Sequence, residues 1–452
     1  MGKIQEIVYR YYGFFKRNGF LRSFCRFVEA VRQKRSDSIY NTLYHKRLSK
    51  KNVSFYNRES RNVKEGSIKF SVIVPAYETE PEHLRMMILS VLRQTYRNLE
   101  LVIADGSPGR IVENTVKEFK DKRIVYRHLE KNGGISENTN AAIAMATGQF
   151  LTFMDHDDFI EQDALLEVEA AIQKGAAIIY TDEDKFDADK NMFFCPNRKT
   201  DYNKDMFLSN NYICHLFTVS KEIADRTGGF RKEFDGAQDY DFILRCIEGA
   251  GDDKIYHIPK VLYHWRTHSR STAANPASKK YAYESGRRVL EAYLKRNNIA
   301  GSVEHTGHLG FYRINYINQT RDGDYVLYLD KRLKPLNKDY ENIMASYLSR
   351  GDIGAVGGRI IDRGGHIVSN GYVKDSNGKV RGKYCGMQMF YSGYMHRAEI
   401  VQDTQAVSSN ACLIRAELSK YYSKDAYKCG EAIRKAGYRI LVDPRVVFKI
   451  QS

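Results

Sequence analysis

The sequence contains no run of about 20 consecutive apolar residues, the length that a helix needs to span a bilayer. It also lacks the uninterrupted apolar N-terminal stretch and small-residue cleavage site of a secretory signal. The seven cysteines are odd in number and form no Cys-x-x-Cys pair, which argues against a disulfide framework. Together these absences predict reduced thiols and a location in the cytosol.

A glycine-rich dinucleotide turn is also missing. Residues 69–75 (KFSVIVP) form the first predicted strand, and the segment that ends it reads Pro75-Ala-Tyr-Glu. A dinucleotide-binding fold needs Gly-x-Gly-x-x-Gly at this place. The sequence therefore excludes a dehydrogenase of that type.

Acidic residues are scarce in the first 66 positions, which hold 16 Lys/Arg against 5 Asp/Glu. The whole chain has a net charge of +16, so most of the excess lies in this one segment. A nucleic-acid-binding protein would carry a recognised motif as well as basic charge, and none is present. We therefore predict no nucleic-acid partner and a basic segment that contacts a surface.

The basic segment has apolar residues at helical spacing. They are Ile4, Ile7, Val8, Tyr11, Tyr12, Phe15, Leu21, Phe24, Phe27, Val28 and Val31. Lys and Arg side chains lie between them, as in a helix that rests in a membrane interface. A helical hairpin packed on the rest of the protein has the same pattern, and the two roles can be combined.

Strand-like and helix-like stretches alternate from residue 67 onwards. Strands are predicted at 69–75, 99–105, 124–126 and 149–154, with helical periodicity between them. This alternation predicts a parallel sheet with functional loops at the carboxyl ends of its strands. Pro75, Asp105 and Asp155 all fall at such ends, as expected for a single nucleotide site.

The last of these strands delivers three carboxylates, in Asp155-His-Asp157-Asp158. Carboxylates at the tip of a buried strand suit Mg²⁺ or Mn²⁺ that holds substrate phosphates. An acidic N-cap on the next helix would give the same composition. The neighbouring motifs favour the metal site.

Seven stretches in order resemble family 2 glycosyltransferases with the GT-A fold, in particular bacterial rhamnosyltransferase-type enzymes of O-antigen and cell-surface polysaccharide synthesis. The stretches are 71–77 (SVIVPAY), 102–107 (VIADGS), 132–142 (NGGISENTNAA), 155–158 (DHDD), 180–185 (YTDEDK), 235–241 (DGAQDYD) and 257–266 (HIPKVLYHWR). The resemblance implies an α/β nucleotide-diphospho-sugar transferase with a Rossmann-like, mostly parallel sheet.

The resemblance also implies which residues bind the donor, a nucleotide-diphosphate sugar linked to dTDP or UDP. These are Pro75, Tyr77, Glu78, Asp105, Asn132, Gly133, Asn140, Asp155 and Arg266. Asp105 is expected to hydrogen-bond the base, and Arg266 to approach the diphosphate. For the metal, Mn²⁺ or Mg²⁺, the resemblance implies Asp157 as a direct ligand, with Asp155 and His264 beside it and His268 as a fallback.

Asp239 is the expected general base, because its motif stands where relatives carry the carboxylate that deprotonates the acceptor hydroxyl. Trp265 and Asp241 are expected to contact the acceptor. The implied function is inverting, metal-dependent transfer of a sugar to a cell-surface polysaccharide intermediate, on a glycan or lipid-linked acceptor at the inner face of the membrane. The alternative is a non-catalytic pseudo-glycosyltransferase that scaffolds a synthesis complex.

The chain also repeats itself. Residues 324–333 (DYVLYLDKRL) resemble 149–158 (QFLTFMDHDD), but Lys331 and Arg332 follow the aspartate and only the first of the three carboxylates is kept. We therefore predict a basic helical segment at 1–66, a catalytic domain at 67–300 and a degenerate half-domain at 301–452. The half-domain is expected to serve acceptor binding, packing or formation of a homo-oligomer.

Overall fold

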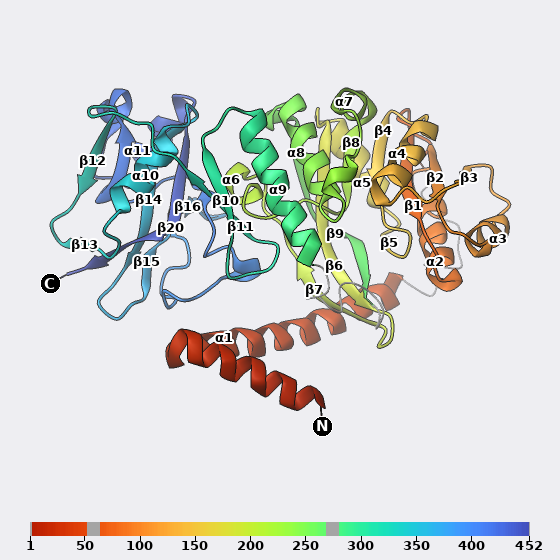
Figure 1. Ribbon diagram of the computed structural model, residues 1–452, viewed down its shortest axis with the longest axis horizontal. Coiled ribbons are helices and arrows are strands. Elements are labelled where there is room, and N and C mark those ends of the chain that lie inside the picture. Colours follow the sequence, from red (N-terminus) through yellow and green to blue (C-terminus); the bar gives the residue numbers. More distant parts are fainter. Residues whose placement is uncertain (1, 52–63, 268–279, 452) are drawn as a thin grey trace.

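The computed structural model describes residues 2–51, 64–267 and 280–451. Figure 1 shows two α/β bodies side by side, one coloured orange to green and the other teal to blue. The long helix α1 lies along one side of both. None of the helices in the described ranges combines the length and the apolar composition needed to cross a bilayer.

The first sheet has nine strands in the order β3-β2-β1-β4-β8-β6-β9-β5, with β7 paired to β6. Its strands are β1 (Phe70–Ala76), β2 (Leu99–Asp105), β3 (Ile124–His128), β4 (Phe150–Phe153), β5 (Phe159–Ile160), β6 (Ile178–Asp187), β7 (Met192–Asn197), β8 (Phe217–Ser220) and β9 (Ile255–Thr267). β1 to β4 are mutually parallel, and β8 runs antiparallel between β4 and β6. The predicted α/β class with a mostly parallel sheet is confirmed.

Helices cover both faces of this sheet. They are α2 (Pro81–Leu92), α3 (Ile111–Lys117), α4 (Ile135–Met145), α5 (Ala164–Ile172), α6 (Lys204–Phe207), α7 (Lys221–Thr227), α8 (Gln238–Ala250) and α9 (Lys280–Arg296). Successive residues of β1 face opposite sides, so Val72 and Val74 pack in the core with α2 and α5, whereas Ile73 packs with α4 and α8. Burial on both sides explains why β1 is apolar except at Ser71.

Strand register brings the predicted site residues to one edge. Pro75 pairs with Ala104, one residue before Asp105, and Ile73 pairs with Phe153, two residues before Asp155. The carboxyl ends of β1, β2 and β4 therefore meet at the same edge of the sheet.

α1 (Gly2–Lys51) is one long helix with a break at Gly19, whose φ of 76° is unsuited to a helix. Its C-terminal part packs on the β6–β7 hairpin. The Asp37 and Asn41 side chains accept hydrogen bonds from the backbone N–H groups of Cys195 and Phe193, at 2.9 and 3.0 Å. Nothing is described for the side chains of residues 2–14, where the first part of the amphipathic pattern falls.

The second sheet follows a β-hairpin, β10 (Gly301–His305) with β11 (Tyr312–Tyr316), and has seven strands. They are β12 (Tyr325–Leu329), β13 (Leu333–Pro335), β14 (Ile353–Ile361), β15 (Ile367–Ser369), β18 (Gln402–Asp403), β19 (Ala411–Arg415) and β20 (Arg439–Ile450). α10 (Tyr340–Leu348) and α11 (Ala426–Lys435) pack on it, and the β16 (Tyr372–Lys374) and β17 (Val380–Gly382) ribbon lies outside it.

The second sheet repeats half of the first. Its order β12-β19-β14-β20-β13 matches β4-β8-β6-β9-β5, and every neighbouring pair has the same relative direction. The register agrees too: Ile160 pairs with Tyr263 in the first sheet, and Pro335 pairs with Phe448 in the second. Ile160 and Pro335 each lie five residues after the aspartates that the sequence repeat aligns, Asp155 and Asp330.

Candidate active site

A pocket of about 300 Å³ opens at the carboxyl edge of the first sheet. Pro75 and Asp155 line it from β1 and β4, Asp239 from the start of α8, and Trp265 from β9. Phe153, Phe217, Phe230 and Phe242 form its apolar floor. Four of the residues singled out in the sequence therefore share one concave site, which is the usual form of a ligand pocket.

Asp155, Asp158 and His215 lie close enough together to hold a metal ion, with one ligand atom from each within 4.8 Å of the others. Carboxylates are suitable ligands for both Mn²⁺ and Mg²⁺, and the imidazole favours Mn²⁺ over the harder Mg²⁺. The predicted set differs, because it named Asp157 and His264 beside Asp155. Asp157 contributes its backbone carbonyl to the same turn, where it accepts from Arg266 Nε at 2.6 Å.

His215 is fixed by two neighbours. Its Nδ1 lies 3.1 Å from the Glu183 carboxylate, and its ring stacks on Tyr263 with centroids 4.5 Å apart and planes at 3°. Burial lowers the pKa of His215, but Cys214 and Glu183 outweigh burial and raise it well above the usual value. An imidazole oriented by a carboxylate on its other nitrogen is the usual arrangement of a metal-binding histidine.

Asp158 is fully buried beneath the site. It accepts from the backbone N–H of Arg266 at 2.7 Å and from the hydroxyl of Tyr263. Burial, together with Asp157 and Asp155, raises its pKa well above the ordinary value. A nearby cation would reverse this effect by favouring the ionised form.

His264 is not in the metal site, which corrects the sequence-based assignment. Adjacent residues of a strand point to opposite faces, so Tyr263 and Trp265 lie on the pocket side while His264 faces α1. Its Nδ1 lies 2.6 Å from Asp184 and its Nε2 lies 3.0 Å from the Tyr44 hydroxyl. Burial lowers its pKa, but Asp184 and Glu161 raise it to about 9. The fallback, His268, lies outside the described residues.

Asp239 sits in the first turn of α8, at the pocket wall. Its Oδ2 accepts from Asn211 Nδ2 at 2.8 Å. Burial is the main cause that raises the pKa of Asp239 above the ordinary value of an aspartate, and the negative charge of Asp155 raises it further. A raised pKa brings a carboxylate closer to the range in which a general base is efficient.

Asp241 and Arg266 are held in the interior, and the acceptor and diphosphate contacts predicted for them stay predictions. Asp241 is fully buried, and both of its oxygens pair with guanidinium groups, those of Arg231 and Arg245. Arg266 is buried with its guanidinium over the ring of Phe159, 5.3 Å from the centroid. Asp241 therefore stabilises the start of α8, and Arg266 stabilises the turn that carries Asp158.

The predicted base contact, Asp105, is completely buried at the end of β2. It accepts from the backbone N–H of Ser107 at 2.9 Å and from the hydroxyl of Tyr126 at 2.7 Å, with His128 Nδ1 at 3.4 Å. A contact to the base by Asp105 stays a prediction, and it requires Tyr126 or His128 to move. Tyr77 is 43% exposed at the mouth of the edge, and Glu78 follows it with a φ of 45°.

Asn132, Gly133 and Asn140 shape the loops around the pocket. Asn132 Oδ1 accepts from the N–H of Gly134 and from Asn138 Nδ2, both at 3.0 Å, and this orders the turn that enters α4. The amide of Asn140 both donates to and accepts from the backbone of Phe230, at 2.8 Å each way. These contacts position the pocket wall, and direct donor contacts by the three residues stay predictions.

His215 is the residue that the sequence analysis missed. β4 and β8 are antiparallel with Phe153 opposite Phe217, so the residues just before β8 must lie beside those just after β4. That pairing, had it been recognised, would have placed His215 next to Asp155.

The family model described as glycosyl transferase family 2 matches residues 71–228. Uncharacterized protein y4gI of Sinorhizobium fredii is 42% identical over 233 residues, which are 50% of this chain and 25% of that protein. O-antigen biosynthesis protein RfbC of Myxococcus xanthus is 31% identical over 251 residues, which are 54% of this chain and 19% of that protein. The chain therefore spans a quarter or less of the length of these two relatives.

Among solved structures, S. aureus TarS 1-349 in complex with UDP-GlcNAc aligns with a TM-score of 0.42 and 20% identity, over 50% of this chain and 67% of that one. A likeness at that level carries no weight here. The family match covers β1 to β8. It includes the turn from Asp155 to Asp158, which supplies two of the three residues of the metal-ligand group. Residues 71–228 therefore match the model of glycosyl transferase family 2, and the first sheet fits a GT-A fold.

Proposed function

We propose that this protein is an inverting, metal-dependent hexosyltransferase that moves a sugar from a UDP- or dTDP-linked donor to a hydroxyl of a cell-surface polysaccharide intermediate. The observation that carries the proposal is one pocket lined by both Asp155 of the metal-ligand group and Asp239. An inverting glycosyl transfer needs a group that holds the departing diphosphate on one side of the anomeric carbon and a base for the acceptor on the opposite side.

Asp155, Asp158 and His215 would hold the metal, Mn²⁺ or Mg²⁺, with Asp157 in the same turn. When bound, such an ion neutralises the charge of the departing nucleoside diphosphate. Glu183 keeps the His215 ring in place for this task, 3.1 Å from its Nδ1.

Asp239 would act on the acceptor. The acceptor oxygen forms a bond to the anomeric carbon, its proton passes to the Asp239 carboxylate, and the bond to the diphosphate oxygen breaks with its electron pair on the leaving group. One displacement inverts the anomeric configuration. Asn211 holds Oδ2 at 2.8 Å and so fixes the orientation of the base.

The acceptor would lie against Trp265. Its ring lines the catalytic pocket and also the neighbouring cleft of about 380 Å³ that runs towards Arg397 and Ile400 of the C-terminal part. The face of an aromatic ring packs well against a sugar ring. Trp265 is the residue that the catalytic pocket and the cleft have in common. Relatives named as an O-antigen biosynthesis protein of Myxococcus xanthus and a chondroitin synthase of Escherichia coli support a polysaccharide acceptor.

α1 would rest on the inner face of the membrane. Phe20, Phe24, Phe27 and Val31 recur every three or four residues, and each is more than half exposed. The polar side of the same helix faces the protein instead, with Glu29 accepting from Ser392 Oγ at 3.0 Å and Arg22 3.8 Å from Glu399. An apolar stripe turned away from the protein, flanked by basic residues, supports a peripheral contact with anionic lipid.

Residues 301–452 would be a degenerate copy of the second half of the catalytic sheet. Asp330 stands where Asp155 stands in the first sheet, but Arg332 binds its carboxylate through Nε at 3.0 Å and NH2 at 2.7 Å. Two cations in this turn leave no place for a divalent metal. The copy then serves the acceptor and the packing of α1.

The test is release of nucleoside diphosphate by the purified protein from a panel of UDP- and dTDP-linked sugars. Metal-dependent release of UDP or dTDP supports the proposal and names the donor class. A protein that binds these donors and releases nothing, with glycan or without, would be a scaffold.

A further inference from the structure

A second pocket, of about 410 Å³, lies between α1 and the C-terminal part of the chain. Five arginines line it: Arg22, Arg26, Arg313, Arg359 and Arg445. Two carboxylates, Glu29 and Glu399, face the same space. The arginines therefore outnumber the carboxylates by three, which gives the pocket the character of an anion site.

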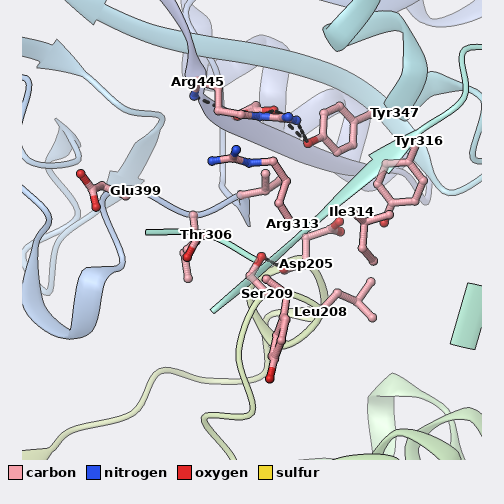
Figure 2. Close-up of a pocket in the computed structure, with 14 residues that line it drawn as sticks. Asp205, Leu208, Ser209, Thr306, Arg313, Ile314, Tyr316, Tyr347, Glu399 and Arg445 are labelled. Carbon is pink, nitrogen blue, oxygen red and sulfur yellow. Dashed lines mark hydrogen bonds and ion pairs between the residues drawn. The ribbon is translucent and has the colours of Figure 1, made fainter. Parts of the chain in front are cut away.

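Some of this charge is already paired. Arg445 binds the buried Asp443 and the hydroxyl of Tyr347, and Arg313 lies 3.0 Å from Glu304. Figure 2 shows Arg313 and Arg445 with Glu399 and Thr306 around the small cavity that adjoins this pocket and shares these residues with it. These ion pairs hold the guanidinium groups of Arg313 and Arg445 at the pocket wall. They also neutralise part of the positive charge that a bound anion would meet there.

Arg359 is different. It is 4% exposed, and its two terminal nitrogens donate to the backbone carbonyls of Met389 and Ala398. Within the described part of the chain no carboxylate pairs with it, and its Nε has no hydrogen-bond partner. A buried charge without a counterion is costly, because desolvation is not repaid by Coulombic attraction. A bound anion would supply the missing charge.

A histidine pair adds donors to the same pocket. His308 and His396 stack with ring centroids 3.7 Å apart, and His308 bonds Glu399. His396 Nδ1 is buried and has no partner among the described residues. His308, His396 and Glu399 also have the spacing of a metal-ligand group, but the five arginines around them repel a cation.

The arginine pocket neighbours the cleft that lies beside the catalytic pocket. Ile400 lines both the arginine pocket and the cleft beside Trp265, and Trp265 lines both that cleft and the catalytic pocket. The three spaces therefore lie next to one another between Asp239 and α1. The apolar stripe of α1, residues 20–31, begins at the arginine pocket, since Arg22 and Arg26 belong to the same two helical turns.

We propose that the arginine pocket binds the phosphate or diphosphate group of a lipid-linked acceptor whose sugar end reaches Asp239. This proposal rests on the proposed function, and it names the chemical class of the acceptor. Arginine forks match phosphate oxygens with paired hydrogen bonds, and the stripe on α1 would hold the lipid near them. The degenerate C-terminal copy would then bind the phosphate or diphosphate group of the acceptor.

The first test removes the charge on α1, whose side chains are exposed and whose replacement leaves the core intact. Calorimetric titration with inorganic pyrophosphate in EDTA compares the parent with Arg22→Gln/Arg26→Gln. The matched control, Arg32→Gln/Arg35→Gln, removes the same charge from the same helix outside the pocket. We expect the pocket pair to weaken pyrophosphate binding about tenfold or more, and the control pair to stay near the parent. Equal weakening in both pairs, or in neither, would overturn the proposal.

The second test separates a lipid head group from free phosphate. Phosphatidylcholine vesicles that contain a polyprenyl diphosphate are compared with vesicles of equal charge that contain phosphatidylglycerol. The parent should prefer the diphosphate vesicles, and Arg22→Gln/Arg26→Gln should lose that preference while Arg32→Gln/Arg35→Gln keeps it. No preference in the parent would overturn the assignment to a lipid-linked acceptor. Nucleoside diphosphate release by the parent is measured separately, so its failure would count against the proposed function and leave the pyrophosphate result standing.

Discussion

The hydroxyl of Tyr44 in α1 lies 3.0 Å from Nε2 of His264 in β9 and also donates to the carboxylate of Glu161. The second nitrogen of the same imidazole bonds Asp184, which accepts from Tyr40 as well. Two tyrosines of α1 are thus bound to a buried charged cluster on the far face of the strand that carries Trp265. The helix that supports the proposed membrane contact is anchored directly behind the catalytic pocket.

Tyr44→Phe should loosen α1. The change leaves Glu161 and His264 buried without this hydrogen bond, and an unpaired buried polar group costs about 1–3 kcal/mol. Limited proteolysis of α1 and the free energy of unfolding in urea measure the effect. Leu43→Ala, at an exposed position one residue away, is the control and should change stability by about 0.5 kcal/mol or less. Equal effects of the two changes would mean that the cluster does not anchor the helix.

The anchor should depend on pH. The pKa of His264 is raised to about 9 by Asp184 and Glu161 against the opposing effect of burial. A raised pKa in the folded state gives stability that is complete below the unfolded value of about 6.5 and is lost as the pH rises to about 9. Thermal melts from pH 6 to 9.5 should therefore fall more steeply for the parent than for His264→Gln. Parallel curves would show that the imidazole is not charged in the folded protein.

Asp239→Asn should abolish turnover while it preserves donor binding. The amide cannot accept the acceptor's proton, and a general base contributes about 10²- to 10⁴-fold to the rate. Steady-state release of nucleoside diphosphate in the presence of acceptor gives kcat, and calorimetry gives the donor Kd. Glu233→Gln, an exposed change on the loop that precedes α8, is the control and should leave both near the parent values. A kcat within a factor of a few of the parent would remove Asp239 as the base.

The stripe on α1 should determine membrane binding. Replacing Phe20, Phe24 and Phe27 together by Ser removes about 1.5–3 kcal/mol of apolar burial per side chain. The fraction of protein that sediments with vesicles containing anionic lipid should drop to the level of a protein that does not bind membranes. Phe15→Ser, which lies before the break at Gly19, serves as a comparison within the same helix. Unchanged sedimentation of the triple variant would leave the stripe as a surface for another protein.

The sheet could be predicted from the sequence because its strands are apolar on both faces and end in distinctive residues. Pro75, Asp105 and Asp155 identify three strand ends, and the family motifs identify the fold to which those strands belong. The repeat at 324–333 was visible for the same reason, since Tyr325–Leu329 keeps the apolar pattern of Phe150–Phe153.

The metal-ligand group could not be predicted to the same degree. The motif around His264 does not state which face of β9 each side chain occupies, and the alternation of strand residues turns His264 away from Asp155. His215 lies in a stretch with no motif of its own, and the β4–β8 pairing places it. Asp241 shares the motif of Asp239, but its carboxylate forms ion pairs with two arginines, Arg231 and Arg245.

The most direct test of the proposed metal and nucleotide site is the metal-dependent stabilisation of the purified protein by UDP and by dTDP. Each is added with and without Mn²⁺ to the parent, His215→Ala, His264→Gln and Asp330→Asn. Binding at 100 times the Kd stabilises the folded state by about 2.7 kcal/mol. We expect a metal-dependent shift with one of the two nucleotides in the parent, in His264→Gln and in Asp330→Asn, and its loss in His215→Ala. A shift that survives His215→Ala and disappears in His264→Gln would contradict the metal site described here.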